Sequence, residues 1–179
     1  MGKQRLVHGV STLVTVLYVG GLLLFFSLMF FQTNCACGGS GRKSVSLSNL
    51  KQAAIGHEMY VADNDGFGPS PKSWVDQVSA YMPNKSERVF ASAHEAIKDG
   101  EYGHAYFRPL GDLKEWAVQN KEEVPLMFDS TDLRRNANGG LELLPDPPRW
   151  GKVNLMAFLD GHVKAIRERP RVEIILPTP

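Results

Sequence analysis

The chain has 179 residues, of which 20 are basic and 19 acidic, and this length is enough for one domain and an appendage. Lys3 and Arg5 lie near the N-terminus, separated from all the other charged residues. From Arg42 onward the sequence carries the other 18 basic and all 19 acidic side chains, a net charge of −1. This balance, without a basic cluster, argues against nucleic-acid binding. Apolar runs mixed with charges throughout this part predict a folded globular unit rather than a disordered segment.

Near the N-terminus, Val10–Phe31 is a run of 22 residues without a charged side chain. As a helix it spans about 33 Å, enough for a hydrocarbon core of about 30 Å. The apolar part of a secretory signal is usually about 7–15 residues, so a retained transmembrane helix over residues 10–31 is the better prediction. Removal as a signal peptide is the alternative. Lys3 and Arg5 favour residues 1–9 in the cytoplasm and the rest of the chain outside it.

The two cysteines of the chain, Cys35 and Cys37, follow this segment with one residue between them. A disulfide within so small a ring would be strained, which predicts two free thiols near a membrane surface. Intermolecular bridging and lipidation are the alternatives. Three of the residues 37–41 are glycines, each of which costs about 1 kcal/mol inside a helix. We therefore expect a Gly-rich tether over residues 32–43 and a folded extracytoplasmic domain over residues 44–179.

The domain opens with a segment that predicts an amphipathic helix over residues 44–63, because apolar residues recur at helical spacing. These apolar positions are Leu47, Leu50, Ala53, Ala54, Tyr60 and Val61. His57 lies on the same side, where a histidine packed in the core is commoner than a catalytic or ligand-binding one. Ile55 and Met59 lie off this side and form a candidate second contact face. The helix should stop at Asp63–Gly66, with Gly66 in a left-handed cap.

A second, shorter helix is predicted within residues 71–83. Ser73 is its expected N-cap and Pro83 its end. Between these residues, one face of the helix is aromatic and apolar, which predicts contact with a core. This face consists of Trp74, Val78 and Tyr81.

Glycines and prolines then divide the chain into short pieces, and the pattern changes to that of strands. Two strands are expected at Tyr102–Arg108 and Val124–Phe128, with a helical turn at Asp112–Gln119 between them. Residues 133–150 predict a loop, with a brief strand at Leu141–Leu144.

The strongest local signal is Asp160-Gly161 between two apolar runs. Asp-Gly is typical of two-residue turns that need a positive φ at both positions, so a hairpin of Val153–Leu159 and His162–Ile166 is expected. Both faces of the first strand are apolar, which predicts an inner strand of an antiparallel sheet covered by the first helix. The predicted fold class is therefore α+β.

In order and spacing, residues 46–166 resemble bacterial pseudopilin-like proteins, which carry a prepilin-type N-terminus and end in a motif of His, nine residues and Asp-Gly. The matching residues are Ser48–Gln52, Met59, Tyr60, Asp63–Gly66, Pro69, Trp74, Tyr81–Pro83, Asn154, Ala157, Phe158 and Asp160–Val163. The resemblance implies a pilin-like domain on a single-pass protein of the bacterial inner membrane. It also implies that the Asp160-Gly161-His162 turn is a structural motif.

The N-terminus resembles the family in part. Gly9 stands where prepilins carry the glycine before the peptidase cut, so the resemblance implies processing between Gly9 and Val10. The glutamate that the family carries fifth after the cut is implicated in assembly, and Val14 stands in its place. A valine removes the buried carboxylate that would need a partner charge within the lipid.

Three further differences lie closer to the domain. The Gly-rich tether interrupts a helix that pilins continue from the membrane into the domain. Ala91-Ser92 replaces a Cys-Pro pair that often follows the second helix. Trp150 stands in the place of the motif's histidine, nine residues before Asp160. The fold should survive these differences, whereas incorporation into a filament is less well supported.

Two groups of polar residues are candidates for chemistry. Asp63 and Asp65 resemble the start of a calcium loop, although the further ligands of a complete loop are not evident and a capped helix is the alternative. Asp129, Asp160 and His162 would suit metal or acid–base chemistry if their strands were neighbours. The backbone conformation of the Asp160-Gly161 turn, however, is enough to explain its residues, so the structural interpretation is favoured. No nucleophile motif, phosphate loop or paired metal-ligand motif occurs, so we predict neither catalytic residues nor a cofactor other than calcium.

These observations together predict a non-enzymatic, membrane-anchored structural or accessory component of a type II secretion or type IV pilus-like system. Its partners would be the lipid bilayer and other pseudopilins or membrane proteins of the secretion machine. The alternative is a membrane-tethered binding or adaptor module on a pilin-derived fold that no longer assembles. Val14 and the glycines favour the alternative, and Gly9 with the extended match favours the assembling protein.

Overall fold

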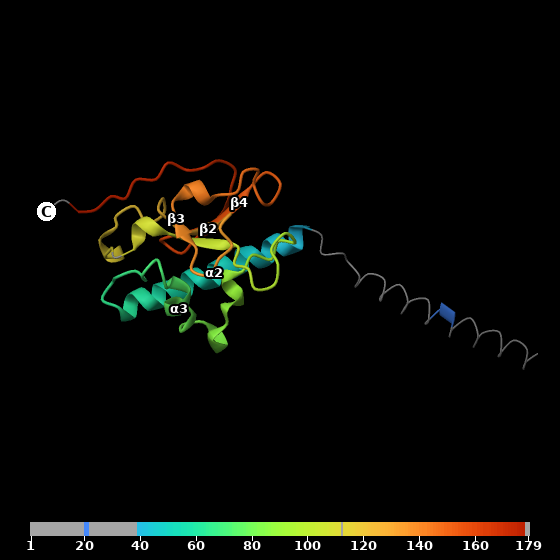
Figure 1. Ribbon diagram of the computed structural model, residues 1–179, viewed down its shortest axis with the longest axis horizontal. Coiled ribbons are helices and arrows are strands. Elements are labelled where there is room, and N and C mark those ends of the chain that lie inside the picture. The colour runs from blue at the N-terminus through green and yellow to red at the C-terminus, as the bar shows by residue number, and fades with distance from the viewer. Residues whose placement is uncertain (1–19, 22–38, 112, 178–179) are drawn as a thin grey trace, which may run out of the picture. The chain divides into compact units, whose positions relative to one another are not determined.

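The computed structural model describes residues 20, 21, 39–111 and 113–177 of the chain (Figure 1). The chain forms two units, residues 1–37 and 38–179. The predicted membrane helix lies outside the described residues apart from Gly20 and Gly21, as do the predicted processing site at Gly9-Val10 and both cysteines. None of the helices in the described part of the chain has the length and apolar character needed to cross a membrane.

The second unit begins with the long helix α2, Gly39–Asp63, which confirms the first predicted helix. The helix starts at Gly39, so residues 39–43, assigned above to the tether, are helical. Its inward side is buried and lies against β2, β4 and β5, as Figure 1 shows for the sheet as a whole. The buried residues are Ser46, Leu50, Ala53, Ala54, His57 and Val61.

At its C-terminal end, α2 closes with two left-handed residues, Asp65 (φ +54°) and Gly66 (φ +85°). The Gly66 N–H donates to the carbonyl of Val61 at 2.9 Å, which satisfies one of the last helical acceptors. The predicted cap is therefore confirmed. The indole of Trp116 packs on Gly66 so closely that a Cβ there would lie 2.5 Å from Cδ2 of the ring.

The second helix, α3 (Trp74–Ser79), is shorter than predicted and ends before Pro83. Ser73 occupies the N-cap position, but its side chain makes no capping hydrogen bond. Instead the side chain of Asn136, held at φ +59°, accepts a hydrogen bond from the Val75 N–H at 2.8 Å. The cap thus comes from a loop 61 residues along the chain from Val75 rather than from the residue next to the helix.

Trp74 anchors α3 in the core. Its ring is fully buried, meets Phe90 edge-on at 5.1 Å between centroids and stacks on Tyr106 at 6.0 Å. Its Nε1–H donates to the carbonyl of Ala137 at 2.9 Å, so the one polar atom of the ring is satisfied.

The sheet has five strands in the order β3-β1-β2-β4-β5. Their bounds are β1 His104–Phe107, β2 Pro125–Asp129, β3 Asn138–Gly139, β4 Asn154–Phe158 and β5 Val163–Ile166. All neighbours are antiparallel except β3, which runs parallel to β1. The α+β class and the strands predicted around β1, β2, β4 and β5 are confirmed, whereas the expectation of a wholly antiparallel sheet is wrong at β3.

The strand predicted at Leu141–Leu144 is also wrong. Leu141–Leu143 forms a 3₁₀ turn, and the strand of this loop is the shorter β3 before it. A 3₁₀ turn places residues three apart on the same side, and here it buries both Leu141 and Leu144 in the core. The apolar residues at 141–144, which predicted a strand, are therefore buried by a 3₁₀ turn instead.

The hairpin of β4 and β5 is confirmed, but its turn differs from the prediction. The Phe158 N–H donates to the carbonyl of His162, and the Gly161 N–H donates to the carbonyl of Phe158, both at 2.9 Å. The loop therefore has three residues, Leu159–Gly161, and of these only Gly161 has a positive φ (+80°). Lys51 on α2 donates from Nζ to the Gly161 carbonyl at 2.7 Å and ties the turn to the helix.

Residues 167–177 form an extended segment on the side of the sheet away from α2 (Figure 1). Val172 and Ile174 pack against the core, while Asn120 holds the backbone of the segment. The Asn120 side chain accepts from the Ile175 N–H at 3.0 Å and donates to the Glu173 carbonyl at 2.8 Å. The sheet is thus covered on both faces, which explains why all five residues of β4 are buried.

Gly66→Ala should destabilise the domain more than Gly100→Ala. Both glycines have nearly the same left-handed φ, +85° and +86°, but no atom lies within 4 Å of a Cβ at Gly100. Gly100→Ala should therefore cost only the backbone term, about 1 kcal/mol, and Gly66→Ala about 2–4 kcal/mol because Trp116 must also move. Urea unfolding of the full chain, followed by circular dichroism, measures both. Equal losses would contradict the role given to Trp116.

Candidate functional site

A buried polar cluster joins the ends of β1, β2 and β4, and we call it the Asp129 cluster; it consists of His104, Asp129, Arg149 and Trp150. Asp129 ends the apolar strand β2 and is fully buried. Its carboxylate accepts hydrogen bonds from the Leu155 N–H at 2.6 Å, the Trp150 Nε1–H at 3.1 Å and Arg149 Nη1 at 3.2 Å. One carboxylate therefore holds β4 and the loop before it against β2.

Arg149 completes the charge balance of this cluster. Its side chain is 8% exposed, and besides Asp129 it donates from Nη1 to the Gly103 carbonyl at 2.6 Å and from Nη2 to the Ser130 carbonyl. These carbonyls lie just before β1 and just after β2. A guanidinium with several fixed donors suits this role because it can satisfy a carboxylate and two carbonyls at once.

His104 is the neutral member of the cluster. Its Nδ1–H donates to the Phe90 carbonyl at 3.1 Å, and its Nε2 lies 3.6 Å from Asp129 Oδ1. Within the described residues, this buried Nε2 makes no hydrogen bond. Burial, followed by the charge of Arg149, lowers the pKa of His104 to about 3, so the ring stays uncharged at neutral pH.

Burial has the opposite effect on the carboxyl group. It raises the pKa of Asp129 to about 6, although Arg149 and the three hydrogen bonds to the carboxylate oppose this shift. Every recorded hydrogen-bond partner of Asp129 is a donor, which agrees with an ionised carboxylate above that pH. Burial also lowers the pKa of Arg149, which nevertheless remains protonated. The cluster is thus built around a buried ion pair whose carboxylate accepts three hydrogen bonds.

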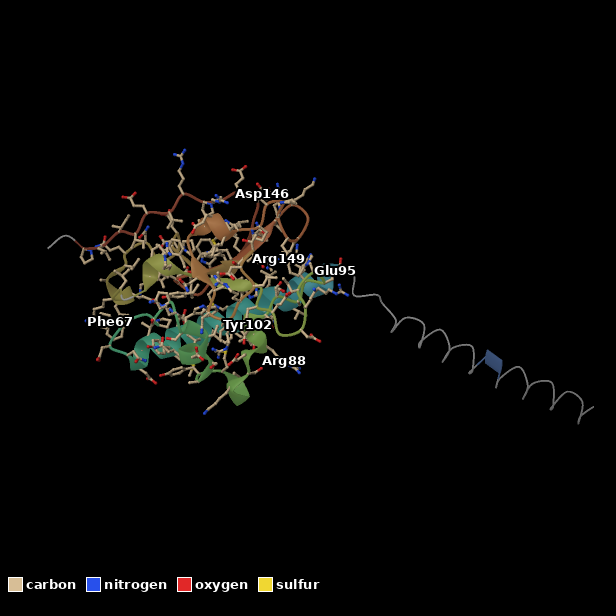
Figure 2. The ribbon with its side chains drawn as sticks, viewed as in Figure 1. Phe67, Arg88, Glu95, Tyr102, Asp146 and Arg149 are labelled. Atoms are coloured by element: carbon tan, nitrogen blue, oxygen red, sulfur yellow. The ribbon has the colours of Figure 1, made fainter. Side chains whose placement is uncertain are left out.

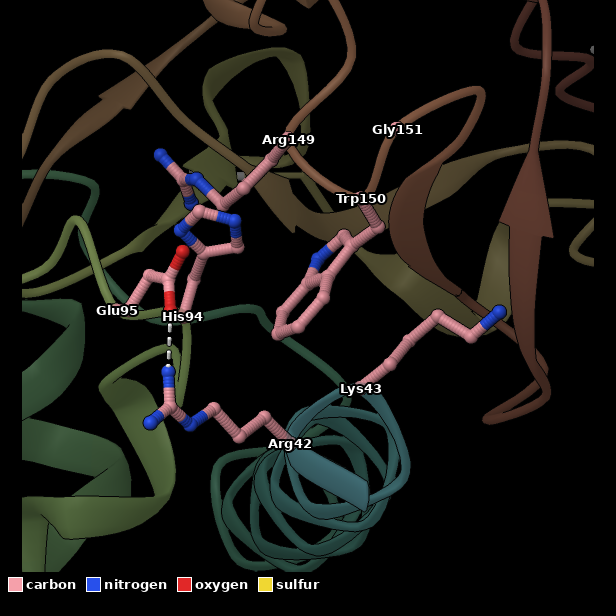
Figure 3. A pocket seen from close by; sticks show the side chains of 7 residues that line it. All are labelled: Arg42, Lys43, His94, Glu95, Arg149, Trp150 and Gly151. Carbon is pink, nitrogen blue, oxygen red and sulfur yellow. Dashed lines mark hydrogen bonds and ion pairs between the residues drawn. The ribbon is translucent and has the colours of Figure 1, made fainter. Parts of the chain in front are cut away.

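An open cavity of about 400 Å³ lies beside Arg149 and Trp150 (Figure 3). Three separate segments line it: the first turns of α2, the loop at residues 94–95 and the loop at residues 149–151. Its lining residues are Arg42, Lys43, His94, Glu95, Arg149, Trp150 and Gly151. Figure 2 places Arg149 and Glu95 at the end of the domain where α2 begins, and Phe67 at the opposite end.

The walls of this cavity carry three cations and one carboxylate. Arg42 pairs with Glu95 at 2.7 Å, and the Trp150 ring meets His94 edge-on at 4.9 Å. Lys43 extends away from the Arg42–Glu95 pair in Figure 3, and no ion pair is recorded for it within the described residues. Donors predominate, so the cavity suits an anion better than a metal ion.

The hairpin residues singled out by the sequence form a local turn. Asp160 accepts a hydrogen bond from the His162 N–H at 3.0 Å, and its Oδ1 lies 2.6 Å from His162 Nδ1. Burial raises the pKa of Asp160, but the contacts with His162 together outweigh burial and hold this pKa below its usual value. The imidazole stacks on Phe158 at 4.3 Å between centroids. These contacts stabilise the turn.

Asp129 does not join this turn. Its carboxylate is bonded to Leu155 near the start of β4, whereas Asp160 follows the end of that strand. At a rise of about 3.3 Å per residue, the two positions are roughly 16 Å apart. The convergence of Asp129, Asp160 and His162 considered from the sequence is therefore wrong.

Asp63 and Asp65, the candidate calcium ligands, lie at the end of α2. After burial, the Asp63 carboxylate is the main cause that raises the pKa of Tyr81, so these two side chains interact. Across the part of the chain that the structure describes, no three acidic, histidine or cysteine side chains lie together as metal ligands. Calcium at this turn stays a prediction.

His57 is a packed histidine, as expected. It is buried, and its Nε2 lies 3.1 Å from Oε1 of Glu115 without a recorded hydrogen bond among the described residues. The same oxygen accepts a hydrogen bond from the Tyr106 hydroxyl at 3.2 Å. Sequence reasoning missed Glu115, because an isolated glutamate in a predicted turn gives no sign of burial. It also missed Arg149, whose partner Asp129 lies across a loop of 20 residues. The proline-rich stretch before Arg149 was the one local hint that this loop is fixed.

Comparison of the chain with protein-family models, with curated proteins and with solved structures found no match. The resemblance to pseudopilin-like proteins therefore stays a prediction that rests on the residues quoted for it.

Asp129→Asn should lower the free energy of unfolding by about 3–5 kcal/mol, because it leaves the Arg149 charge buried without its counterion. Asp132→Asn is the matched control, since Asp132 pairs with the exposed Arg134. An ion pair at the surface contributes about 0–1 kcal/mol, so this change should be small. Urea unfolding at pH 7 distinguishes the two, and a loss of less than 1 kcal/mol for Asp129→Asn would contradict the role of the cluster.

His104→Gln should reduce the acid sensitivity of the domain. The folded pKa of His104, about 3, lies below its unfolded value of 6.5, so between these values only the unfolded state binds the proton. Its contribution to stability is therefore lost as pH falls, by about 1.4 kcal/mol per pH unit. Asp129, with its pKa raised from 3.8 to about 6, acts in the opposite direction between those values.

Unfolding free energies measured at pH 7, 6, 5 and 4 test this expectation. The variant should be less stable at pH 7 by about 1–3 kcal/mol, because the hydrogen bond to Phe90 is disturbed. It should nevertheless lose less stability than the wild type between pH 6 and 4. Parallel pH profiles for the two proteins would show that His104 is not the acid-sensitive group.

Proposed function

We propose that this protein is a non-enzymatic, membrane-anchored component or accessory of a type II secretion or type IV pilus-like assembly. Residues 10–31 would hold it in the bacterial inner membrane, with the α+β domain outside the cytoplasm. Helix α2 would pack laterally against a helix of a neighbouring subunit. The observation that carries this proposal is an uncharged seam on the outer side of α2.

This outer seam of α2 consists of Val45, Ser48, Gln52, Ile55, Met59 and Ala62, all of them exposed. The spacing alternates between three and four residues, which is the spacing of the contact positions in helix pairs. At 1.5 Å per residue the seam is about 26 Å long. It lies opposite the buried side of the helix, so the sheet cannot cover it.

Three side chains of the seam are large and apolar. Val45 is 51% exposed, Ile55 45% and Met59 49%. Single exposed apolar residues are ordinary, but three of them on one uncharged helical face are typical of a contact surface. The seam also includes Ile55 and Met59, which the sequence placed off the core side. A helix that packs on a neighbouring helix would bury all three.

The start of α2 at Gly39 also supports this reading over the alternative. The glycines at positions 39 and 41 are helical, so the interruption expected from the Gly-rich tether does not extend beyond residue 38 in the described part of the chain. Pilins continue one helix from the membrane into the domain. A helix that begins this close to the apolar segment resembles that arrangement.

The adaptor module remains the second candidate, and the cavity beside Arg149 is the observation that favours it. A cavity of about 400 Å³ falls within the usual range for small-ligand sites, about 300–1,000 Å³. A binding module would use this cavity without needing contacts along the outer seam of α2. Both candidates share the membrane anchor and the absence of catalysis.

Met59→Cys, in the full chain with Cys35 and Cys37 replaced by serine, should crosslink to a neighbouring subunit in native membranes. A short bis-maleimide reagent and mass spectrometry of the crosslinked band would identify the partner. Glu58→Cys is the matched control, because Glu58 is exposed on the same helix but points about 100° away from Met59. We expect at least a tenfold higher yield at position 59.

Equal yields at the two positions would mean collision rather than a specific helix contact, and would contradict the assembly proposal. A protein that stays uncrosslinked at both positions would contradict it as well, and would leave the adaptor module as the better account.

A further inference from the structure

We propose that the cavity beside Arg149 binds the phosphate of an acidic phospholipid headgroup. The inference rests on the membrane anchoring of the proposed function, but not on assembly. Two features of the described residues carry it, the donors that line the cavity and its aromatic wall, together with the short chain between the cavity and the predicted membrane helix.

Arg149, His94 and Lys43 supply the N–H donors of the cavity. Arg149 uses both N–H groups of Nη1 and one of Nη2 within the Asp129 cluster. No hydrogen bond to its Nε–H or to the second N–H of Nη2 is recorded among the described residues, and the side chain, 8% exposed, lines the cavity. The His94 Nδ1 accepts from the Ala96 N–H at 3.1 Å, which places the proton of the neutral ring on Nε2 and makes it a donor. Lys43 lines the cavity from α2, with its ammonium group on the other side of Trp150 from His94 in Figure 3.

The charge of the site matches a phosphodiester. Arg42 is balanced by Glu95, and Arg149 is balanced by Asp129 behind it, so Lys43 remains as the unmatched charge of the lining. A phosphodiester carries one negative charge and offers only acceptors to these donors. Guanidinium and ammonium groups both bind phosphate oxygens well.

Trp150 forms the aromatic wall. Its Nε1–H is held by Asp129, so the ring has a fixed orientation beside His94. Indole rings are enriched at the headgroup level of membranes, where one part of the ring is apolar and the other polar. In this cavity the ring would lie against the glycerol carbons next to the phosphate.

The place of the cavity in the chain decides between a lipid and another anion. Arg42 follows the predicted membrane helix by only eleven residues, counted from Phe31. Even fully extended, that length of chain spans at most about 40 Å. An anchored domain therefore holds this cavity within reach of the bilayer surface, where anionic lipids attract basic side chains. An acidic peptide would have no comparable reason to be present.

The test uses the full chain in a neutral detergent, with lipid binding counted by native mass spectrometry. Phosphatidylglycerol, phosphatidylcholine and inorganic phosphate are the probes. We expect a preference for phosphatidylglycerol over phosphatidylcholine. The double variant R42Q/K43Q should weaken phosphatidylglycerol binding about 10–30-fold. Both side chains lie outside the Asp129 cluster, so the fold should be retained.

Two further variants define the site. R169Q/R171Q removes the same charge from exposed residues of the C-terminal segment and should leave binding unchanged. His94→Leu removes a hydrogen-bond donor that lines the cavity but is distant in sequence from the predicted membrane helix. This variant should weaken binding about 3–10-fold. If R42Q/K43Q weakens lipid binding and His94→Leu does not, the two basic residues attract lipid without the cavity, and the proposal is overturned.

Other results would overturn it in different ways. Unchanged binding by R42Q/K43Q would show that the lipid binds elsewhere. Displacement of the lipid by inorganic phosphate, with no preference between the two lipids, would identify free phosphate as the ligand. Tighter binding of an acidic peptide than of phosphatidylglycerol would identify a protein partner. Because lipid counting needs no neighbouring subunit, its outcome is independent of the crosslinking at Met59.

Discussion

The rest of the domain depends on the buried ion pair between Asp129 and Arg149. The pair joins the end of β2 to the start of β4 and to the loop between residues 145 and 153, in addition to the pairing of the two strands and the hydrogen bonds of Asn154 to that loop. Buried ion pairs add little stability compared with apolar contacts, but losing one partner is costly, so they specify a geometry. Here the geometry places Trp150 and Arg149 at the edge of the cavity. The same residues thus connect the core with the candidate binding surface.

The domain presents two surfaces that the core does not use. One is the outer seam of α2, uncharged and exposed along most of the helix. The other is the cation-lined cavity at the N-terminal end of that helix. Both belong to, or adjoin, the helix that follows the predicted membrane segment. The proposed function uses the first surface for contact with a neighbouring helix, and the proposed lipid site uses the second.

Local patterns could be predicted from the sequence, and contacts across the chain could not. The helical period in residues 44–63 and the Asp160-Gly161 signal identified α2 and the hairpin of β4 and β5, because spacing within one element determines which side is buried. The cap of α3 by Asn136 and the pairing of Asp129 with Arg149 depend on loops brought together by folding. The start of α2 was missed because propensity disfavours glycine, whereas the hydrogen bond from the Ala93 N–H to the Ser46 hydroxyl holds the first turns.

Retention of residues 10–31 in the mature protein is the most direct requirement of a membrane-anchored role. Intact mass and N-terminal sequencing of the protein from native membranes measure it. A start at Val10 is expected, since it would show that a prepilin peptidase recognises Gly9 and that the anchor remains. A start at Met1 would mean an ordinary anchor and favour the adaptor module. A start at or beyond Cys37 would show that the apolar segment is a signal peptide, and would contradict both the anchored assembly and the lipid-binding cavity.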